Sequence, residues 1–74
     1  MTTIVVYSKS NCIYCEQAKS LLTSKGLTYT ELDVKNPDTL AELKQLVPGV
    51  KTVPQIFIDG KLIGGYTELV PHLA

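Results

Sequence analysis

The feature that most constrains the fold is a pair of cysteines, Cys12 and Cys15, placed between two different apolar patterns. They are the only cysteines in the chain, and their spacing is C-x-x-C. An apolar, β-branched run at residues 4–7 precedes them, and a helical apolar pattern follows them. Because residues i and i+3 are neighbours on one helix face, the two thiols can close into a disulfide. In the order strand, polar loop, C-x-x-C, helix, this spacing indicates redox chemistry rather than metal binding.

Residues that favour helix starts and ends predict the next elements. The first helix is expected to begin at an Asn11 N-cap and to end at Gly26. A second strand is predicted at residues 28–34. A second helix should open at Asn36 and Pro37, since proline suits the first helical position. Its inward face is expected to carry four apolar residues: Leu40, Leu43, Leu46 and Val47.

The last third of the chain predicts a hairpin and a short helix. Residues 55–58 and 61–63 flank the turn dipeptide Asp59-Gly60, and a glycine pair ends the second strand before a helix at about residues 66–73. The order is therefore β-α-β-α-β-β-α. An α/β fold follows, with a mixed four-stranded sheet covered by three helices. Residues 1–74 are expected to form a single domain.

Composition limits the class of partner. With 45% hydrophobic and 19% charged residues, the chain has the composition of an ordinary globular protein. Its formal net charge of zero argues against nucleic acid or an anionic membrane as the partner. No apolar run approaches the roughly 20 residues of a membrane span. Because residues 1–3 lead directly into the first strand, we expect no signal peptide. Since the two cysteines could form only one disulfide, across two intervening residues, we expect a reducing, cytoplasmic location.

The two cysteines are expected to have different roles. Cys12 would lie in the first turn of its helix, where the backbone N–H groups and the helix dipole favour a thiolate, and Lys9 adds positive charge nearby. Cys12 is therefore predicted as the nucleophile and the deeper Cys15 as the resolving thiol. Two buried thiols at accidental spacing are the plain alternative. A mononuclear metal site is disfavoured, because only His72 could add a ligand of the usual kind.

Two further motifs have both a plain and a functional interpretation. Pro54, after Thr52 and Val53, is either a simple strand-entry proline or a device that leaves the neighbouring backbone free for a ligand. The segment from Gly64 to Glu68 is either a strand-to-helix turn or an anion site built from backbone N–H groups.

Together, three segments resemble the glutaredoxins, small oxidoreductases of the thioredoxin fold that use glutathione. The resemblance rests on residues 7–15, 52–59 and 63–69. It implies a cis Pro54 facing the active site, with Thr52 and the backbone of Val53 holding the cysteinyl part of glutathione. It also implies that Lys9 and Tyr14 position the glycyl end and the sulfur. The γ-glutamyl end would be held by four residues: Gly65, Tyr66, Thr67 and Glu68.

The implied activity is glutathione-dependent reduction of protein–glutathione mixed disulfides and of protein disulfides. The implied partners are glutathione and glutathionylated or disulfide-containing proteins, ribonucleotide reductase among them. The protein is expected to be a monomer and to carry no metal. Two alternatives keep the same cysteines. One is a [2Fe–2S] carrier in which Cys12 of each of two subunits and two glutathiones ligate the cluster. The other is an electron donor reduced by thioredoxin reductase.

The chain departs from the family pattern at three places. Ile13 replaces the proline that dithiol members most often carry, which changes the hydrogen bonding next to Cys12. Glu68 replaces the usual aspartate, which bears on its direct contact with the ligand. The last predicted helix is short for the family, and we expect Leu69 or Leu73 to be partly exposed.

Overall fold

The computed structural model describes residues 2–74 and shows a four-stranded mixed sheet with three helices. The strands are β1 (Ile4–Ser8), β2 (Thr30–Asp33), β3 (Gln55–Ile58) and β4 (Lys61–Gly64). The helices are α1 (Ile13–Ser24), α2 (Pro37–Leu46) and α3 (Tyr66–Leu73). The order of elements and the fold class predicted from the sequence are confirmed.

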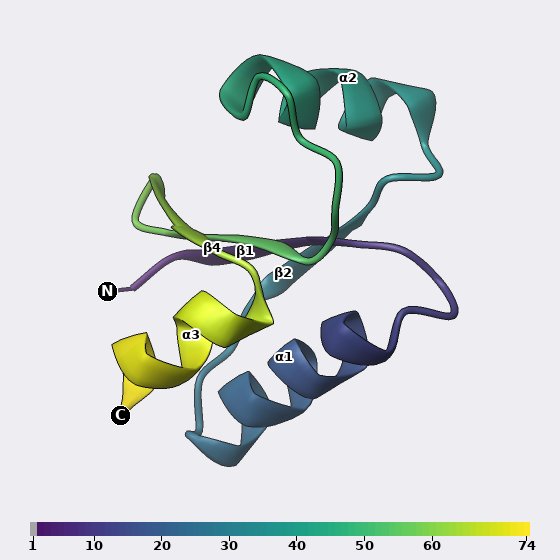
Figure 1. Cartoon of the computed structure of the whole chain (residues 1–74). Helices are drawn as coiled ribbons and strands as arrows, with labels where there is room; N and C mark the ends of the chain where they lie inside the picture. Colours follow the sequence, from purple (N-terminus) through teal and green to yellow (C-terminus); the bar gives the residue numbers. More distant parts are fainter. Residues whose placement is uncertain (1) are drawn as a thin grey trace.

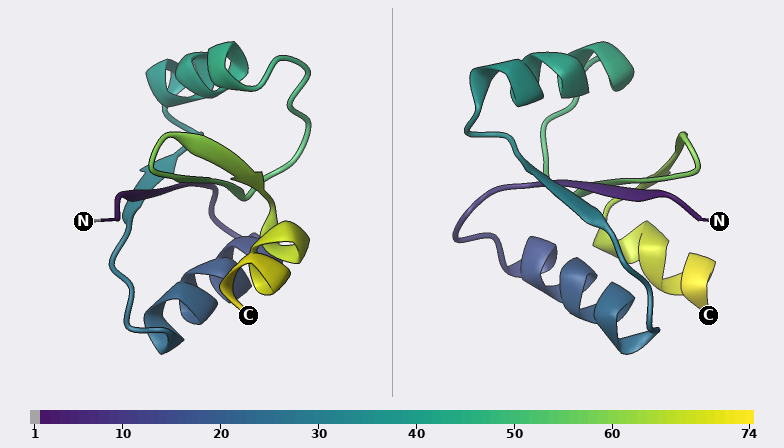
Figure 2. Two further views of the ribbon diagram at one scale, coloured as in Figure 1. Left: turned by 90° about the vertical axis from the view of Figure 1, so that its left-hand side faces the viewer. Right: turned by 180° about the vertical axis from the view of Figure 1, so that it is seen from behind.

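The strand order in the sheet is β2-β1-β3-β4. β1 pairs with β2 in parallel and with β3 antiparallel, so the first βαβ unit and the hairpin meet at β1. Helices α1 and α3 lie on one face of the sheet and α2 lies alone on the other, as two further views confirm (Figures 1 and 2). The three-layer arrangement places the C-terminal end of β1 beside the start of α1.

The hydrophobic core lies between the sheet and the α1–α3 layer. Its buried members come from β1, β3 and both helices: Ile4, Val6, Ala18, Leu22, Ile56 and Leu69. Apolar side chains at three- and four-residue intervals place one face of α1 against the sheet. Of the two leucines expected to be partly exposed, Leu69 is fully buried, whereas Leu73 is partly exposed at the edge of the core.

Several local predictions are confirmed and others need correction. Asn36 caps α2 through its side-chain oxygen, and Pro37 takes the first helical position. The hairpin turn places Asp59 at φ 51° and Gly60 at φ 81°, as a type I′ turn requires. β2 is shorter than predicted. Leu46 is 53% exposed, so it does not belong to the buried face predicted for α2, of which Leu43 is the buried residue.

α2 is anchored to the sheet by a polar contact as well as an apolar one. Tyr7 of β1 is buried and packs edge-on against Phe57. Its hydroxyl also donates a hydrogen bond to a carboxylate oxygen of Glu42. Burial and the nearby Glu42 carboxylate raise the pKa of Tyr7 to about 12.

Within residues 2–74 no helix is long and apolar enough to cross a membrane.

The core predicts unequal costs for two leucine truncations in helices. Leu22→Ala removes a fully buried side chain and should lower the free energy of unfolding by about 2–5 kcal/mol. Leu46→Ala, the matched control at a largely exposed position, should cost below about 1 kcal/mol. Urea denaturation followed by circular dichroism measures both. Equal losses in the two variants would contradict the placement of the core.

Candidate active site

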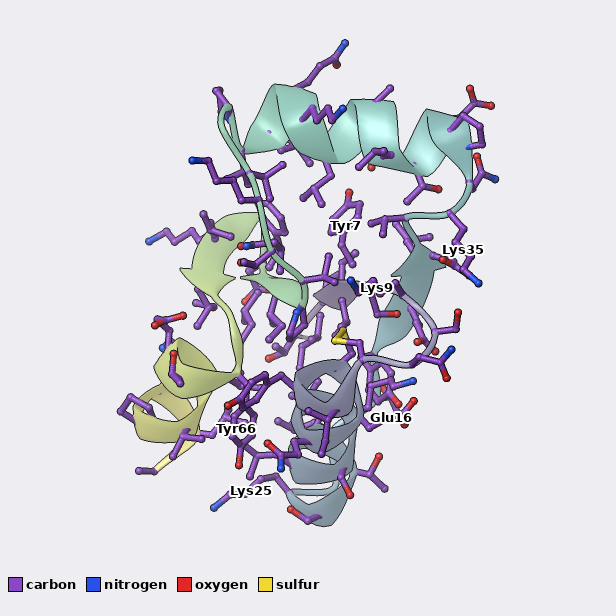
Figure 3. All side chains as sticks on the ribbon, turned by 45° about the vertical axis from the view of Figure 1, so that its right-hand side comes forward. Tyr7, Lys9, Glu16, Lys25, Lys35 and Tyr66 are labelled. Carbon is purple, nitrogen blue, oxygen red and sulfur yellow. A yellow bond between two sulfur atoms is a disulfide. The ribbon has the colours of Figure 1, made fainter. Side chains whose placement is uncertain are left out.

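Cys12 is the N-cap residue of α1, with extended backbone at φ −117°. Its Sγ accepts a hydrogen bond from the backbone N–H of Cys15 at 3.2 Å. The two cysteines are joined as a disulfide with their Cα atoms 5.2 Å apart. Figure 3 shows the sulfur atoms at the N-terminal end of α1, beside the end of β1. When the disulfide opens, the same backbone donor and the helix dipole favour a Cys12 thiolate.

The loop before Cys12 corrects the predicted helix start. Asn11 is not the N-cap: its φ of 57° lies in the left-handed region, which asparagine tolerates better than most residues. This turn lets Cys12 occupy the N-cap position instead. Cys12 is 9% exposed and Cys15 is fully buried, which confirms that Cys15 is the more shielded thiol.

A polar network ties α1 to the two parallel strands. The ammonium of Lys19 contacts Glu16 at 3.0 Å and Glu31 of β2 at 2.9 Å. Buried Ser8 donates a hydrogen bond to the same Glu31 oxygen at 2.6 Å. The hydrogen bond to Glu31, followed by that to Glu16, raises the pKa of Lys19, and the bonds from Ser8 and Lys19 lower the pKa of Glu31. The pairing with Lys19 also offsets the negative charge that Glu16 brings one turn after Cys12.

The second predicted motif lies directly against the disulfide. The Val53–Pro54 peptide bond is cis, as the resemblance implied. The Val53 carbonyl oxygen lies 3.7 Å from Cys12 Sγ. β3 begins only at Gln55, and within residues 2–74 the backbone N–H and C=O of Val53 have no backbone partner. An extended chain beside Val53 could therefore form backbone hydrogen bonds next to the sulfur.

A cleft of about 420 Å³ brings three distant segments together. It is lined by eight of the residues predicted from sequence: Tyr14, Thr52, Val53, Pro54, Gly65, Tyr66, Thr67 and Glu68. The rings of Tyr14 and Tyr66 stack with centroids 6.1 Å apart, which links α1 to α3 at one wall of the cleft. Lys9 does not line this cleft; it lies in the loop after β1 and lines a second groove.

Two further lining residues were not singled out as site residues by the sequence reasoning. Gln55 follows Pro54, and its side-chain amide donates a hydrogen bond to the Thr52 carbonyl at 3.0 Å. Gly64 has φ +124°, and a Cβ there would lie 2.8 Å from the Glu68 side chain. The sequence signal for Gly64 was the glycine pair. Nothing in the spacing indicated that Gln55 would support the cleft.

The N-terminus of α3 is held by its own carboxylate. Glu68 Oε1 accepts from the Gly65 N–H and Oε2 from the Thr67 hydroxyl, both at 2.7 Å. Because glycine has no side chain, only this half of a capping box is made. The bond from Thr67, followed by that from Gly65, lowers the pKa of the Glu68 carboxyl. Among the described residues no group of three or more His, Cys, Asp or Glu side chains is placed to hold a metal ion.

Comparison with known proteins gives consistent matches over nearly the whole chain. Residues 4–63 match the family model for glutaredoxin. Glutaredoxin 3 of Escherichia coli K12 is 42% identical over 69 residues, covering 93% of this chain and 83% of the relative. Among solved structures, glutaredoxin 1 from Francisella tularensis, complexed with cacodylate, superposes with a TM-score of 0.81. That match has 28% identity and covers 97% of this chain and 92% of the other. The buckwheat glutaredoxin–glutathione complex also has a TM-score of 0.81, with 35% identity over 95% of this chain and 66% of the other.

The Glu68 contacts predict a measurable titration. Hydrogen bonds from Thr67 and Gly65 favour the charged carboxylate, so the pKa of Glu68 should lie below its ordinary value of 4.5. The stabilisation that follows is fully present above that value and is lost as the pH falls through the folded pKa. Thr67→Val should raise this pKa, and Thr39→Val in α2 should leave it unchanged. Carboxyl chemical shifts in an NMR pH titration report both, and an unmoved midpoint in Thr67→Val would contradict the contact.

Proposed function

The chain belongs to the glutaredoxin family, and on that basis we propose that it is a glutathione-dependent thiol–disulfide oxidoreductase. Thiol–disulfide redox chemistry is common to the family and matches the Cys12–Cys15 disulfide. The observation that carries glutathione dependence is the cleft, which begins at the Val53 carbonyl beside Cys12 Sγ and ends at the N-terminus of α3.

The two ends of the cleft suit two parts of glutathione, its central cysteinyl residue and its γ-glutamyl end. The cysteinyl part carries a backbone N–H and C=O, which match the unpaired backbone groups of Val53 beside the disulfide. The γ-glutamyl end carries a carboxylate and an ammonium. Backbone N–H groups at the start of α3, other than the Gly65 N–H that donates to Glu68, suit the carboxylate, and Glu68 suits the ammonium. The related buckwheat protein was solved as a complex with glutathione, which supports this assignment.

The remaining proposed contacts lie near Cys12, at that end of the cleft and, for Lys9, in the neighbouring groove. Thr52 flanks Val53, and the stacked Tyr14 and Tyr66 rings form one wall. Lys9 is exposed in the loop three residues before Cys12 and supplies a cation for the glycyl carboxylate. Pro54 is buried and keeps Val53 outside the regular ladder of β3.

The reaction begins with the Cys12 thiolate. It attacks the glutathione sulfur of a protein–glutathione disulfide, forms a Cys12–glutathione disulfide, and expels the protein thiolate, which takes up a proton. The thiolate of a second glutathione attacks that disulfide and releases oxidised glutathione and the Cys12 thiolate. With a protein disulfide, Cys12 first forms a mixed disulfide with the protein. Cys15 then displaces the protein thiol, and two glutathiones reduce the Cys12–Cys15 disulfide.

The proposed partners are glutathione and cytoplasmic proteins that carry disulfides or glutathionylated cysteines, with ribonucleotide reductase as one example. The protein acts as a monomer in this scheme. Residues 1–74 function as a single domain, since the site draws on segments from Lys9 to Glu68.

The decisive experiment compares two sources of electrons. Turnover of a small glutathione mixed disulfide is measured with glutathione plus glutathione reductase, and separately with thioredoxin reductase. Turnover with the glutathione system alone supports the proposal. Turnover with thioredoxin reductase alone refutes the glutathione contacts and favours an electron donor that keeps the same cysteines. Inactivity with both, together with a visible chromophore after anaerobic reconstitution, would favour the cluster carrier.

The two cysteines should respond differently to substitution. Cys12→Ser should lower kcat/KM for the glutathione mixed disulfide by at least about 100-fold, because serine is a far poorer nucleophile for disulfide exchange. Cys15→Ser, the matched control in the same motif, should retain this activity and lose reduction of protein disulfides. Steady-state assays with both substrates separate the roles. Turnover that survives in Cys12→Ser and disappears in Cys15→Ser would reverse the assignment.

A further inference from the structure

A second groove of about 170 Å³ lies on the α2 side of Val53. Besides Val53, four apolar residues line it, from α2, from the turn after β2 and from the loop before β3: Val34, Leu40, Leu43 and Val50. Leu43 is buried, whereas the other three are partly exposed and present apolar surface to the groove. This volume equals that of several water molecules, at about 30 Å³ each in the liquid. The groove therefore has room for one apolar side chain.

Glutathione has no apolar group that would contact this apolar lining. Its γ-glutamyl end is assigned to the other cleft, and its glycyl residue has no side chain to place against Leu40 or Val50. The groove nevertheless shares Thr52 and Val53 with the glutathione cleft, so the two are continuous at the backbone next to Cys12. A ligand bonded to Cys12 through its own cysteine can therefore extend into the groove, provided that it has a further side chain.

The charge at the groove indicates which kind of ligand side chain it would attract. Lys9 and Lys51 both line it and both are exposed. Within residues 2–74 neither ammonium forms an ion pair, whereas Lys19 has two carboxylate partners. The groove thus combines an apolar floor with two cations that have no carboxylate against them. An apolar side chain next to an acidic one complements that combination.

We propose that this groove binds the polypeptide segment around the target cysteine of a protein substrate, in extended form, with an apolar side chain over Leu40 and an acidic residue at Lys51. The inference rests on the proposed oxidoreductase function and adds a substrate preference to it. It applies to the step in which Cys12 bonds to the protein's own sulfur. The unpaired backbone of Val53 aligns the segment, and the groove selects among segments.

Activated peptides isolate that step. Each peptide carries one cysteine in a disulfide with thionitrobenzoate, an aromatic thiol with a low pKa. The Cys12 thiolate bonds to the peptide sulfur, the disulfide breaks, and thionitrobenzoate leaves as the coloured thiolate. The Cys15→Ser variant of the full chain stops the reaction at the Cys12–peptide disulfide. Stopped-flow absorbance then gives one second-order rate constant per peptide.

Three peptides test the preference. The first has Leu and Asp on both sides of the cysteine, the second has Lys in place of Asp, and the third has Gly in place of Leu. The Leu–Asp peptide should react roughly fivefold faster than the Lys peptide, the scale expected for replacing attraction by repulsion at an exposed site. It should also react faster than the Gly peptide.

Two variants in the same background locate the preference in the groove. Lys51→Glu should reverse the ranking of the Asp and Lys peptides. Leu40→Asp should abolish the advantage of Leu over Gly. Lys61→Glu is the matched control: Lys61 follows the hairpin turn at the Ile4 end of β1, away from Cys12, and its substitution should leave the ranking unchanged. Peptides that react at equal rates, or a ranking that Lys51→Glu does not alter, would overturn the assignment of the groove.

Failure of this inference is distinguishable from failure of the proposed function. The same preparations without Cys15→Ser are assayed for turnover of the small glutathione mixed disulfide. Turnover there together with an unselective groove refutes only the substrate preference. Absence of that turnover in the unsubstituted chain refutes the proposed function, whatever the ranking of the peptides.

Discussion

The packing of α1 against the sheet is the constraint on which the site depends. Cys15, Ala18 and Leu22 are fully buried on one face of this helix, and that face fixes both the depth and the direction of its N-terminus. The Lys19–Glu31–Ser8 network adds a polar link between the helix and the ends of β1 and β2. As a result, Cys12 is held at the N-cap, where its sulfur lies 3.7 Å from the Val53 carbonyl oxygen.

The surroundings of the disulfide are divided at Val53. On one side, the cleft is lined by polar groups at the start of α3 and by the stacked Tyr14 and Tyr66, an arrangement suited to a small zwitterionic ligand. On the other side, α2 contributes an apolar floor beside Lys9 and Lys51, two lysines without an ion pair in the part of the chain that the structure describes. A chain with zero net charge therefore still has a local field near its reactive sulfur. Cys12 therefore lies beside two surfaces of different chemistry, which meet at Val53.

Local patterns predicted most of the architecture because the signals were local. The Asn36–Pro37 helix start, the Asp59–Gly60 turn and the C-x-x-C motif each depend on neighbours within a few residues. The errors occurred where the conformation of a loop or the packing of a helix decides. The sequence favours Asn11 as the N-cap, but the turn that leads out of β1 moves the cap to Cys12. Leu46 fits a helical stripe, yet its side chain is 53% exposed, and Leu43 is the buried residue of α2.

The sequence by itself determined the redox chemistry and the order of elements, because thiol spacing and apolar periodicity are properties of short segments. Its resemblance to the glutaredoxins also indicated which three segments form a site. Only the tertiary structure decided how they meet: Val53 beside the Cys12 sulfur, Tyr14 stacked on Tyr66, and Lys9 lying outside the main cleft with Lys51. These contacts join residues that the sheet register and the docking of two helices bring together. Such long-range geometry has no signature in any single stretch of sequence.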